Sequence, residues 1–469
     1  MTQKLPFAAI LLVFASSPLA AGEPYSSTYE AHAGPPTLIR NATVLDGTGR
    51  RLDGADVLMR DGRIVAIGPG LDSAGATVID AQGRWVTPGL IDVHSHLGVY
   101  ASPGVNASQD GNEATDPVTA GVWAEHSVWP QDPGFETALE GGVTTLQVLP
   151  GSANLIGGRG VTLRNVHATT YQAMKFPGAP QGLKMACGEN PKRVYGDKDR
   201  APSTRMGNVA GYRQAFADAQ DYQRQQEKYA AELAAYEKNK GKHKAKDGDE
   251  DAVAPVPPKR DLRLETLVAA MKGEVRVHVH CYRADEMATM LDVAREFNFK
   301  IAAFHHGVEA YKISERLAQE GVCGALWADW WGFKMEAYDG IWENLAFVDA
   351  PQNGCAIVHS DSDEGIQRLN QEAAKGMARG QRAGFSIPPE RAIRWVTSNP
   401  AKALGIADRV GTLGPGKLAD VVVWNRDPFS VYALPDLVYS DGAVAYDRKA
   451  PPAKPASDFL LGQPAVGAP

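Results

Sequence analysis

The chain has 469 residues, more than one hydrophobic core usually serves, so we expect a large domain with a smaller module attached. Its formal net charge is −7, which predicts no broad basic surface. This balance argues against nucleic acid or anionic lipid as the main partner and favours a small-molecule substrate. A homo-oligomer is compatible with it.

The N-terminus has the layout of a cleavable secretory signal peptide over residues 1–22. Lys4 precedes an apolar run over residues 5–15, and small residues follow it up to Gly22. The run is too short to cross a bilayer, and no cysteine follows that could carry a lipid. We therefore expect a secreted or periplasmic protein without a membrane anchor. A buried N-terminal helix is the alternative.

Four cysteines lie in apolar runs that we interpret as strands: Cys187, Cys281, Cys323 and Cys355. An oxidising compartment would make them candidates for two disulfides. Small buried thiols are the favoured interpretation, because each cysteine has apolar neighbours. The cysteines have no C-x2-C spacing, so they are left out of the predicted metal site.

Both ends of the mature chain have the sequence pattern of short antiparallel strands. Residues 36–87 alternate apolar and polar side chains, and residues 409–448 return to the same pattern. An Asp-Gly turn interrupts each segment, Asp61-Gly62 in the first and Asp441-Gly442 in the second. Neither segment can bury a face alone, so we expect both to form one small β-sandwich. The Ala- and Pro-rich residues 449–469 are predicted to be disordered.

Between these ends, residues 88–408 are predicted to form an α/β domain, a (β/α)8 barrel. Short apolar runs alternate there with helix-like stretches: GLIDVHSH, TTLQVLPG, GLKMACGEN, VRVHVHCY, KIAAFHHG, CGALWADWW and CAIVHSD. Strands that are apolar throughout and spaced by helices indicate a parallel sheet that closes. Residues 218–261 depart from the pattern and predict a helical excursion followed by a charged, flexible surface loop, with a coiled-coil contact as the weaker alternative.

Histidines mark the C-terminal ends of several predicted strands, where barrel enzymes place their chemistry. His94 and His96 are two residues apart, so they share a face and can hold one metal ion, although two surface histidines would give the same pattern. His280 is nearer its strand end than His278. We therefore predict His280 as a ligand and His278 as a residue of the barrel interior.

Residues 86–96, VTPGLIDVHSH, resemble the PGLIDxHxH signature of the amidohydrolase superfamily. The resemblance runs through most of the mature chain, whose further segments look like those of the imidazolonepropionase-related branch, including exported members. Its further landmarks are KMACGENPKRVYG, HVHCYRADEM, FHHGVEAYKI, VHSDSDEG, TSNPAKALGI and GTLGPGKLADVVVWNRDPF. The family implies a metal-activated water that attacks a carbonyl or related carbon, usually of an amide or cyclic amide.

The resemblance also selects among the remaining candidates. The adjacent His305 and His306 should point to opposite faces of a strand, and similarity to the family selects His306 as the ligand, leaving His305 to pack against helices. Asp361 resembles the family's aspartate at the end of the last strand, a metal ligand and general base. Asp363 is the fallback for this role. His359 is either a partner of a ligand or an inert interior residue.

A site of neutral imidazoles needs anionic ligands to balance the metal charge. Glu189 is the favoured one, because it lies at the predicted rim where the other ligands converge. Many relatives use a carboxylated lysine at this strand, so Lys184 competes, although we expect it near the barrel floor. The predicted ligand set for one or two divalent ions, zinc by default, is His94, His96, Glu189, His280, His306 and Asp361. Manganese, iron, cobalt and nickel suit the same ligands.

Residues of the predicted rim are candidates for substrate binding. Arg193 and Arg205 could hold the carboxylate of a peptide-like or N-acyl amino acid substrate, with Tyr195 beside them, and the Trp327-to-Trp331 loop could wall an apolar side chain. The alternative is that these residues only hold loops together.

The function predicted from these residues is metal-dependent hydrolysis of a carbon–nitrogen bond. The bond would belong to a non-standard or cyclic amide, an N-acyl amino acid or a dipeptide-like compound. Deamination or phosphoester hydrolysis on the same metal centre is one alternative. A non-catalytic barrel used for binding is another, but the complete ligand set favours catalysis.

Overall fold

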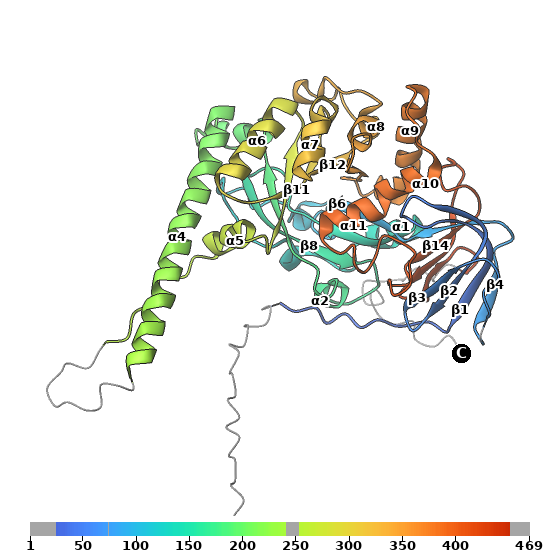
Figure 1. Ribbon diagram of the computed structural model, residues 1–469. Helices are drawn as coiled ribbons and strands as arrows, with labels where there is room; N and C mark the ends of the chain where they lie inside the picture. The colour runs from blue at the N-terminus through green and yellow to red at the C-terminus, as the bar shows by residue number, and fades with distance from the viewer. Residues whose placement is uncertain (1–24, 74, 241–252, 451–469) are drawn as a thin grey trace, which may run out of the picture.

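The computed structural model describes residues 25–73, 75–240 and 253–450, and it holds two eight-stranded sheets with helices around one of them (Figure 1). The predicted signal peptide, residues 241–252 of the charged insertion and nearly all of the predicted disordered tail lie outside the described residues. Among the helices of the described ranges, none combines the length and apolar character that a membrane crossing needs.

Both ends of the described chain contribute to one sheet, here called the terminal sheet. Its strands are β1 (Thr37–Leu45), β2 (Arg51–Arg60), β3 (Arg63–Gly68), β4 (Thr77–Asp80), β5 (Trp85–Pro88), β14 (Val421–Trp424), β15 (Pro435–Ser440) and β16 (Ala443–Asp447). The order is β16-β15-β14-β5-β1-β2-β3, with β4 beside β1, and the sheet has its own core. The two ends therefore associate as expected, in one continuous hydrogen-bonded sheet.

The two predicted Asp-Gly turns are confirmed. Asp61 and Gly62 have φ angles of 50° and 73° and join β2 to β3, and Asp441 and Gly442 have φ angles of 48° and 74° and join β15 to β16. Positive φ at both central residues is the conformation that matches the twist of a tight hairpin.

The second sheet, the barrel sheet, carries the candidate site. Its strands are β6 (Leu90–Ser95), β7 (Val143–Val148), β8 (Ile156–Arg164), β9 (Gly182–Ala186), β10 (Arg276–Cys281), β11 (Ile301–His306), β12 (Cys323–Leu326) and β13 (Ala356–Val358). The seven apolar runs of the sequence form the other seven strands, but β8 pairs antiparallel with β7 and β9. Only residues 149–155 separate β7 from β8, too short a crossover for a parallel partner. The expectation of eight parallel strands is thus wrong at β8.

The barrel sheet is nearly closed. No ladder joins the edge strands β13 and β6 among the described residues, but the residues after β13 bond to β6. The backbone N–H of Asp361 donates to the carbonyl oxygen of His94 at 2.9 Å, and that of Ser360 donates to the Asp92 carboxylate at 3.1 Å. We call this junction the seam.

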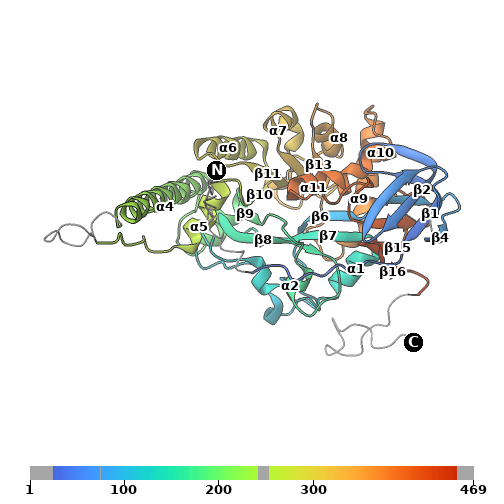
Figure 2. The same cartoon turned by 60° about the horizontal axis from the view of Figure 1, so that its bottom comes forward.

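Helices lie around the barrel sheet (Figures 1 and 2). They are α1 (Gly134–Glu140), α2 (Tyr171–Met174), α3 (Glu189–Gly196), α4 (Arg205–Lys240), α5 (Leu262–Met271), α6 (Ala284–Glu296), α7 (Ser314–Glu320), α8 (Asn344–Asp349), α9 (Leu369–Arg382), α10 (Pro389–Ala392) and α11 (Ser398–Leu404). Helix α4 begins at Arg205, earlier than the predicted insertion at residue 218. It stands at the end of the barrel remote from the terminal sheet, and its length is roughly 54 Å.

The four cysteines form two disulfides, Cys187–Cys281 and Cys323–Cys355, so the favoured interpretation as buried thiols is wrong. Each disulfide joins neighbouring strands, β9 to β10 and β12 to β13. The parallel pairing brings the Cα atoms to 5.2 Å and 4.6 Å, within the range that a disulfide spans.

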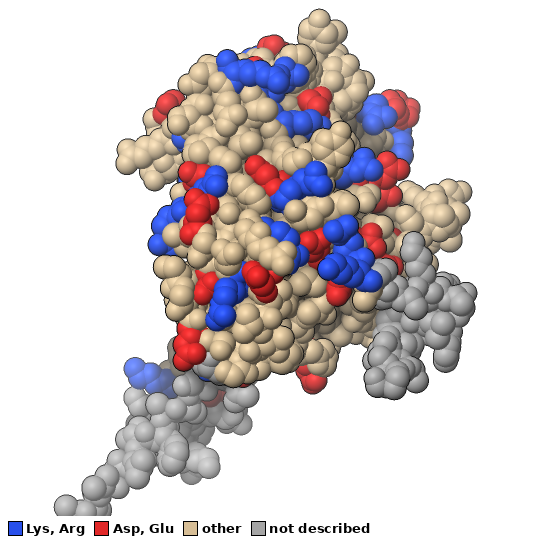
Figure 3. Space-filling model, turned by 90° about the vertical axis from the view of Figure 1, so that its right-hand side faces the viewer, with Lys and Arg blue, Asp and Glu red and all other residues tan. Residues whose placement is uncertain are grey.

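The molecular face that carries the terminal sheet mixes both signs of charge. Figure 3 shows Lys and Arg side chains interspersed with Asp and Glu across it, without a broad field of either sign.

Candidate metal site

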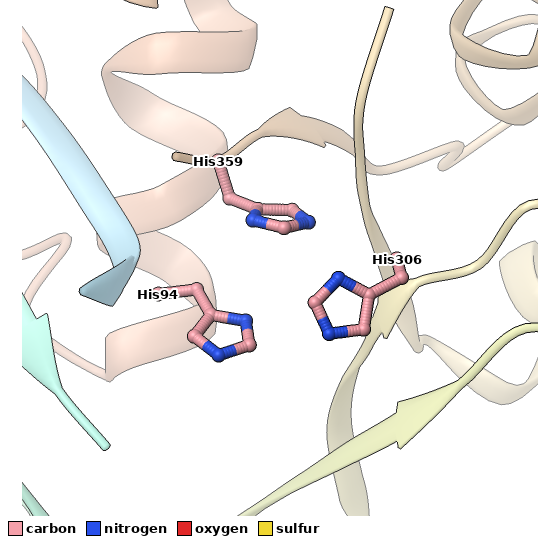
Figure 4. A group of neighbouring side chains, drawn as sticks. All are labelled: His94, His306 and His359. Atoms are coloured by element: carbon pink, nitrogen blue, oxygen red, sulfur yellow. The ribbon is translucent and has the colours of Figure 1, made fainter. Parts of the chain in front are cut away.

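Buried histidines from four strands or strand ends converge in the barrel interior. His94, on β6, has its ring centroid 5.0 Å from that of His306, on β11, and 5.1 Å from that of His359, directly after β13 (Figure 4). His280, on β10, lies 4.5 Å from His306 by ring centroids. Strands from distant parts of the chain thus bring the imidazoles together.

A carboxylate completes the cluster on one side. An Asp361 carboxylate oxygen lies 3.0 Å from Nε2 of His96 and 3.4 Å from Nε2 of His94, and the other lies 3.9 Å from Nδ1 of His306. One ligand atom each of His94, His96 and Asp361 falls within a mutual distance of 4.8 Å. The structure therefore brings five of the six predicted ligands into one place: His94, His96, His280, His306 and Asp361.

A second three-residue group shares His94. His94, His306 and His359 each offer a nitrogen within 4.8 Å of the others, and all three are buried. His359 was left between two roles by the sequence, and here it belongs to the cluster. The signal was its place two residues before Asp361, on the same predicted strand face.

His305 and His306 both enter the barrel, so the expectation that His305 packs against the helices is wrong. His305 pairs in register with His280, and its Nε2 lies 2.9 Å from Nδ1 of His278. Strict alternation would turn His306 outward. Its φ of 72° is left-handed, which interrupts the alternation and turns its ring back toward His280.

Lys184 reaches the imidazoles, whereas Glu189 points to another partner. The Lys184 amine, expected near the floor, lies 3.0 Å from Nε2 of His94, because its long side chain spans one layer of the barrel. Glu189 begins α3, and its carboxylate pairs with Lys334 at 3.3 Å. Glu189 belongs to neither three-residue group found among the described residues.

The polar atoms of the cluster fit a metal ion. Nδ1 of His94, His280, His305 and His306 and both ring nitrogens of His359 are buried and have no hydrogen-bond partner in the described chain. Such atoms are costly unless something else satisfies them. Burial lowers the pKa values of these imidazoles, to about 3 for His359, so the rings are neutral, as metal ligation requires.

Asp361 is held as a carboxylate. Burial alone would raise its pKa, but the hydrogen bond with His96 and the nearby charge of Lys184 lower it below the usual range. Burial lowers the pKa of Lys184 to about 8. The backbone of Asp361 is left-handed, with a φ of 53°, the kind of strained conformation that clusters at functional sites.

The predicted substrate-binding residues are not gathered at the imidazoles. Tyr195 is fully buried, and its hydroxyl donates to the Asp116 carbonyl at 2.7 Å, so it holds a loop instead of substrate. Arg205 pairs with Glu336 at 2.9 Å and with Glu286 at 3.2 Å. Arg193 is exposed on α3. In this structure, Tyr195 and Arg205 therefore make the loop-holding contacts that the sequence left open as the alternative.

Known proteins are similar to this chain in sequence and fold. A family model described as "Amidohydrolase family" matches residues 356–447, which include Asp361. A crystal structure of an amidohydrolase from Thermotoga maritima is 33% identical, with a TM-score of 0.74, over 88% of this chain and 100% of that one.

Curated sequences agree. Amidohydrolase tasK of Hapsidospora irregularis is 33% identical over 95% of this chain and 47% of its own length, so the chain spans about half of that relative. Imidazolonepropionase of Mesorhizobium japonicum is 24% identical over 82% of this chain and 90% of its own length.

Proposed function

Because the chain belongs to the amidohydrolase family, we propose that it hydrolyses the carbon–nitrogen bond of a non-standard amide. The substrate class is a cyclic amide, an N-acyl amino acid or a dipeptide-like compound. The single observation that carries this proposal is the convergence of His94, His96 and Asp361 beside neutral, unpartnered imidazoles. That donor set is typical of hydrolytic metal centres.

The proposed metal ligands are His94, His96 and Asp361, with His280 and His306 on the neighbouring strands. Zinc fits these nitrogen and oxygen donors, for one or two ions. A divalent ion bound here would lower the pKa of a water molecule toward roughly 7 and polarise the substrate carbonyl.

Asp361 is the proposed general base and acid. Its carboxylate accepts one proton from the attacking water as the water oxygen bonds to the carbonyl carbon. It then donates that proton to the nitrogen as the carbon–nitrogen bond breaks, which releases a neutral amine and restores the carboxylate. The lowered pKa of Asp361 keeps it ionised at neutral pH, so that its carboxylate is free of a proton before the reaction.

Lys184 is the proposed anionic bridge, in its carboxylated form, in place of Glu189. Its amine is at the imidazoles, whereas the Glu189 carboxylate is engaged with Lys334. Carboxylation joins the neutral amine to carbon dioxide and releases one proton, which supplies the negative charge that the imidazoles lack.

A substrate panel on the purified chain tests the function. We expect metal by elemental analysis and turnover of a dipeptide, N-acyl amino acid or cyclic amide, and Asp361→Asn should remove turnover while the folded chain remains. Adenosine and a phosphate monoester in the same panel test deamination and phosphoester hydrolysis. Turnover of those compounds alone, or full amide hydrolysis by Asp361→Asn, would overturn the proposal.

Export remains part of the proposal. Two disulfides are expected in an oxidising compartment such as a periplasm and are rare in a cytosol. Expression with residues 1–22 intact should give a mature chain that begins near Gly22, as read by mass spectrometry of the exported fraction. A full-length chain retained in the cytosol would contradict export.

A further inference from the structure

A loop over the candidate site turns Lys334 and Glu336 inward, whereas its Trp330 and Phe333 are exposed. We call residues 327–343, between β12 and α8, the rim loop. Glu336 is only 4% exposed, and its carboxylate accepts the backbone N–H of Glu189 at 2.9 Å and binds Arg205. Lys334 donates to the side-chain oxygen of Asn190 at 3.1 Å. These bonds anchor the rim loop to α3 and α4.

The contact between the rim loop and α3 leaves no room for a side chain at Gly188. Gly188, which precedes α3, has a φ of 80°, and a Cβ atom there would lie 2.1 Å from Oε1 of Glu336. A glycine is required both for the left-handed conformation and for this close approach. Buried polar contacts therefore fix the position of the rim loop.

Aromatic side chains of the rim loop stand in solvent. Phe333 is 59% exposed and Trp330 is 41% exposed. The Phe333 ring lies 6.1 Å from each of the rings of Tyr282 and Trp327, and the Trp330 ring lies 5.5 Å from that of Trp327. An exposed group of this kind next to a site marks a surface that binds something apolar.

The aromatic surface is continuous with the imidazole cluster. The Trp327 ring lies 4.4 Å from that of His306, and the Tyr282 ring stacks on His306 at 5.3 Å. Phe333 and Trp330 thus extend a wall that begins at a candidate ligand. A substrate that reacts beside His306 can therefore place an adjoining group against this wall.

The cations beside the wall are already paired. Lys334 lies 3.3 Å from the Glu189 carboxylate and 3.7 Å from that of Glu336, and Arg205 binds both Glu336 and Glu286. A substrate carboxylate at this side would compete with protein carboxylates for each of these charges. An apolar group meets no such competition.

We propose that Phe333 and Trp330 bind an aromatic or bulky apolar group of the substrate, attached next to the scissile amide. The inference rests on the proposed function, since it assigns one part of the substrate of that same site. The occupant is the substrate itself, because the ring contacts lead from the exposed side chains to His306.

Two cyclic amides that differ only in this group test the proposal. The zinc-loaded full chain is titrated calorimetrically with 5-benzylhydantoin and with 5-methylhydantoin. We expect the benzyl compound to bind at least about tenfold more tightly, from burial of its ring. Phe333→Ala should reduce this preference to less than about threefold. Met335→Ala is the matched control, because Met335 lies in the same loop and is 84% exposed.

Each outcome decides the inference. Equal affinity for the two compounds in the unmodified chain, or an equal loss in Phe333→Ala and Met335→Ala, would overturn it. A change of molecular mass in Phe333→Ala by sedimentation would assign the surface to a second copy of the chain and also overturn it. Hydrolysis of both compounds is measured in parallel. Tighter binding of the benzyl compound without hydrolysis would support the aromatic binding surface and contradict the proposed reaction. Hydrolysis without tighter binding of the benzyl compound would support the reaction and contradict the binding surface.

Discussion

Nζ of Lys184 lies 3.0 Å from Nε2 of His94, although Lys184 is level in the barrel with His278, one layer below His280. A glutamate would be too short to span that layer. The position therefore favours a long side chain whose end group can reach the metal ligands from beneath.

We expect Lys184→Ala to lower zinc affinity at least about tenfold, because it removes the anionic bridge. Metal content after dialysis against a weak chelator measures this. Glu189→Ala is the comparison, and it should retain metal because its carboxylate pairs with Lys334. Loss of metal from Glu189→Ala with retention in Lys184→Ala would return the bridge to Glu189.

His359→Ala should also weaken metal binding, since His359 belongs to one of the two three-residue groups and both of its ring nitrogens are unpartnered. Removal of a chelatable ion should lower the Tm of the unmodified chain more than that of the variant, because a ligand bound only to the folded state stabilises it. His167→Ala, at an exposed histidine, is the control. An unaltered metal titration in His359→Ala would make this residue a packing group.

Opening the Cys323–Cys355 disulfide should destabilise the chain by about 4 kcal/mol. This is the free-energy cost, from chain entropy, of closing a loop whose ends are 32 residues apart in the unfolded chain. The double variant Cys323→Ala, Cys355→Ala should show a lower Tm in thermal denaturation. Unfolding the unmodified chain in denaturant without reductant should expose no reactive thiol. Four titratable thiols under those conditions would refute both disulfides.

Stability should depend on pH through Glu286. Burial, chiefly, raises its pKa from 4.5 to about 7, and the adjacent Glu336 adds to this against the effect of Arg205. Because the pKa is higher in the folded state, protonated Glu286 favours folding, and its full contribution to the free energy of unfolding is present below pH 4.5. This contribution is lost as the pH rises through about 7. The unmodified chain should lose roughly 3 kcal/mol relative to Glu286→Gln over this interval.

Parallel denaturation series of the two chains measure this difference. A constant gap in unfolding free energy at every pH would show that Glu286 titrates normally.

The sequence was sufficient where short-range rules apply. The His-x-His pair at the end of β6 placed His94 and His96 together, and both Asp-Gly turns were predicted. These features depend on strand alternation and turn chemistry, which neighbouring residues determine.

Other features depend on contacts that no local pattern contains. The inward turn of both His305 and His306 required a left-handed backbone at His306, which alternation does not predict. The ion pairs of Arg205 with Glu286 and Glu336 were not predicted, because these partners lie far along the chain. Strand β8 was missed because its glycine-rich sequence lacks the apolar run of its neighbours.

The seam between β13 and β6 has a consequence for how the molecule opens. Asp361 lies on one side of it and His94 and His96 lie on the other, so an ion shared by them would fasten the two edges together. Without that fastening, amide hydrogen exchange should rise first along these two edges, since few backbone bonds join them. The metal site proposed to hydrolyse the substrate would then also stabilise the closure of the barrel.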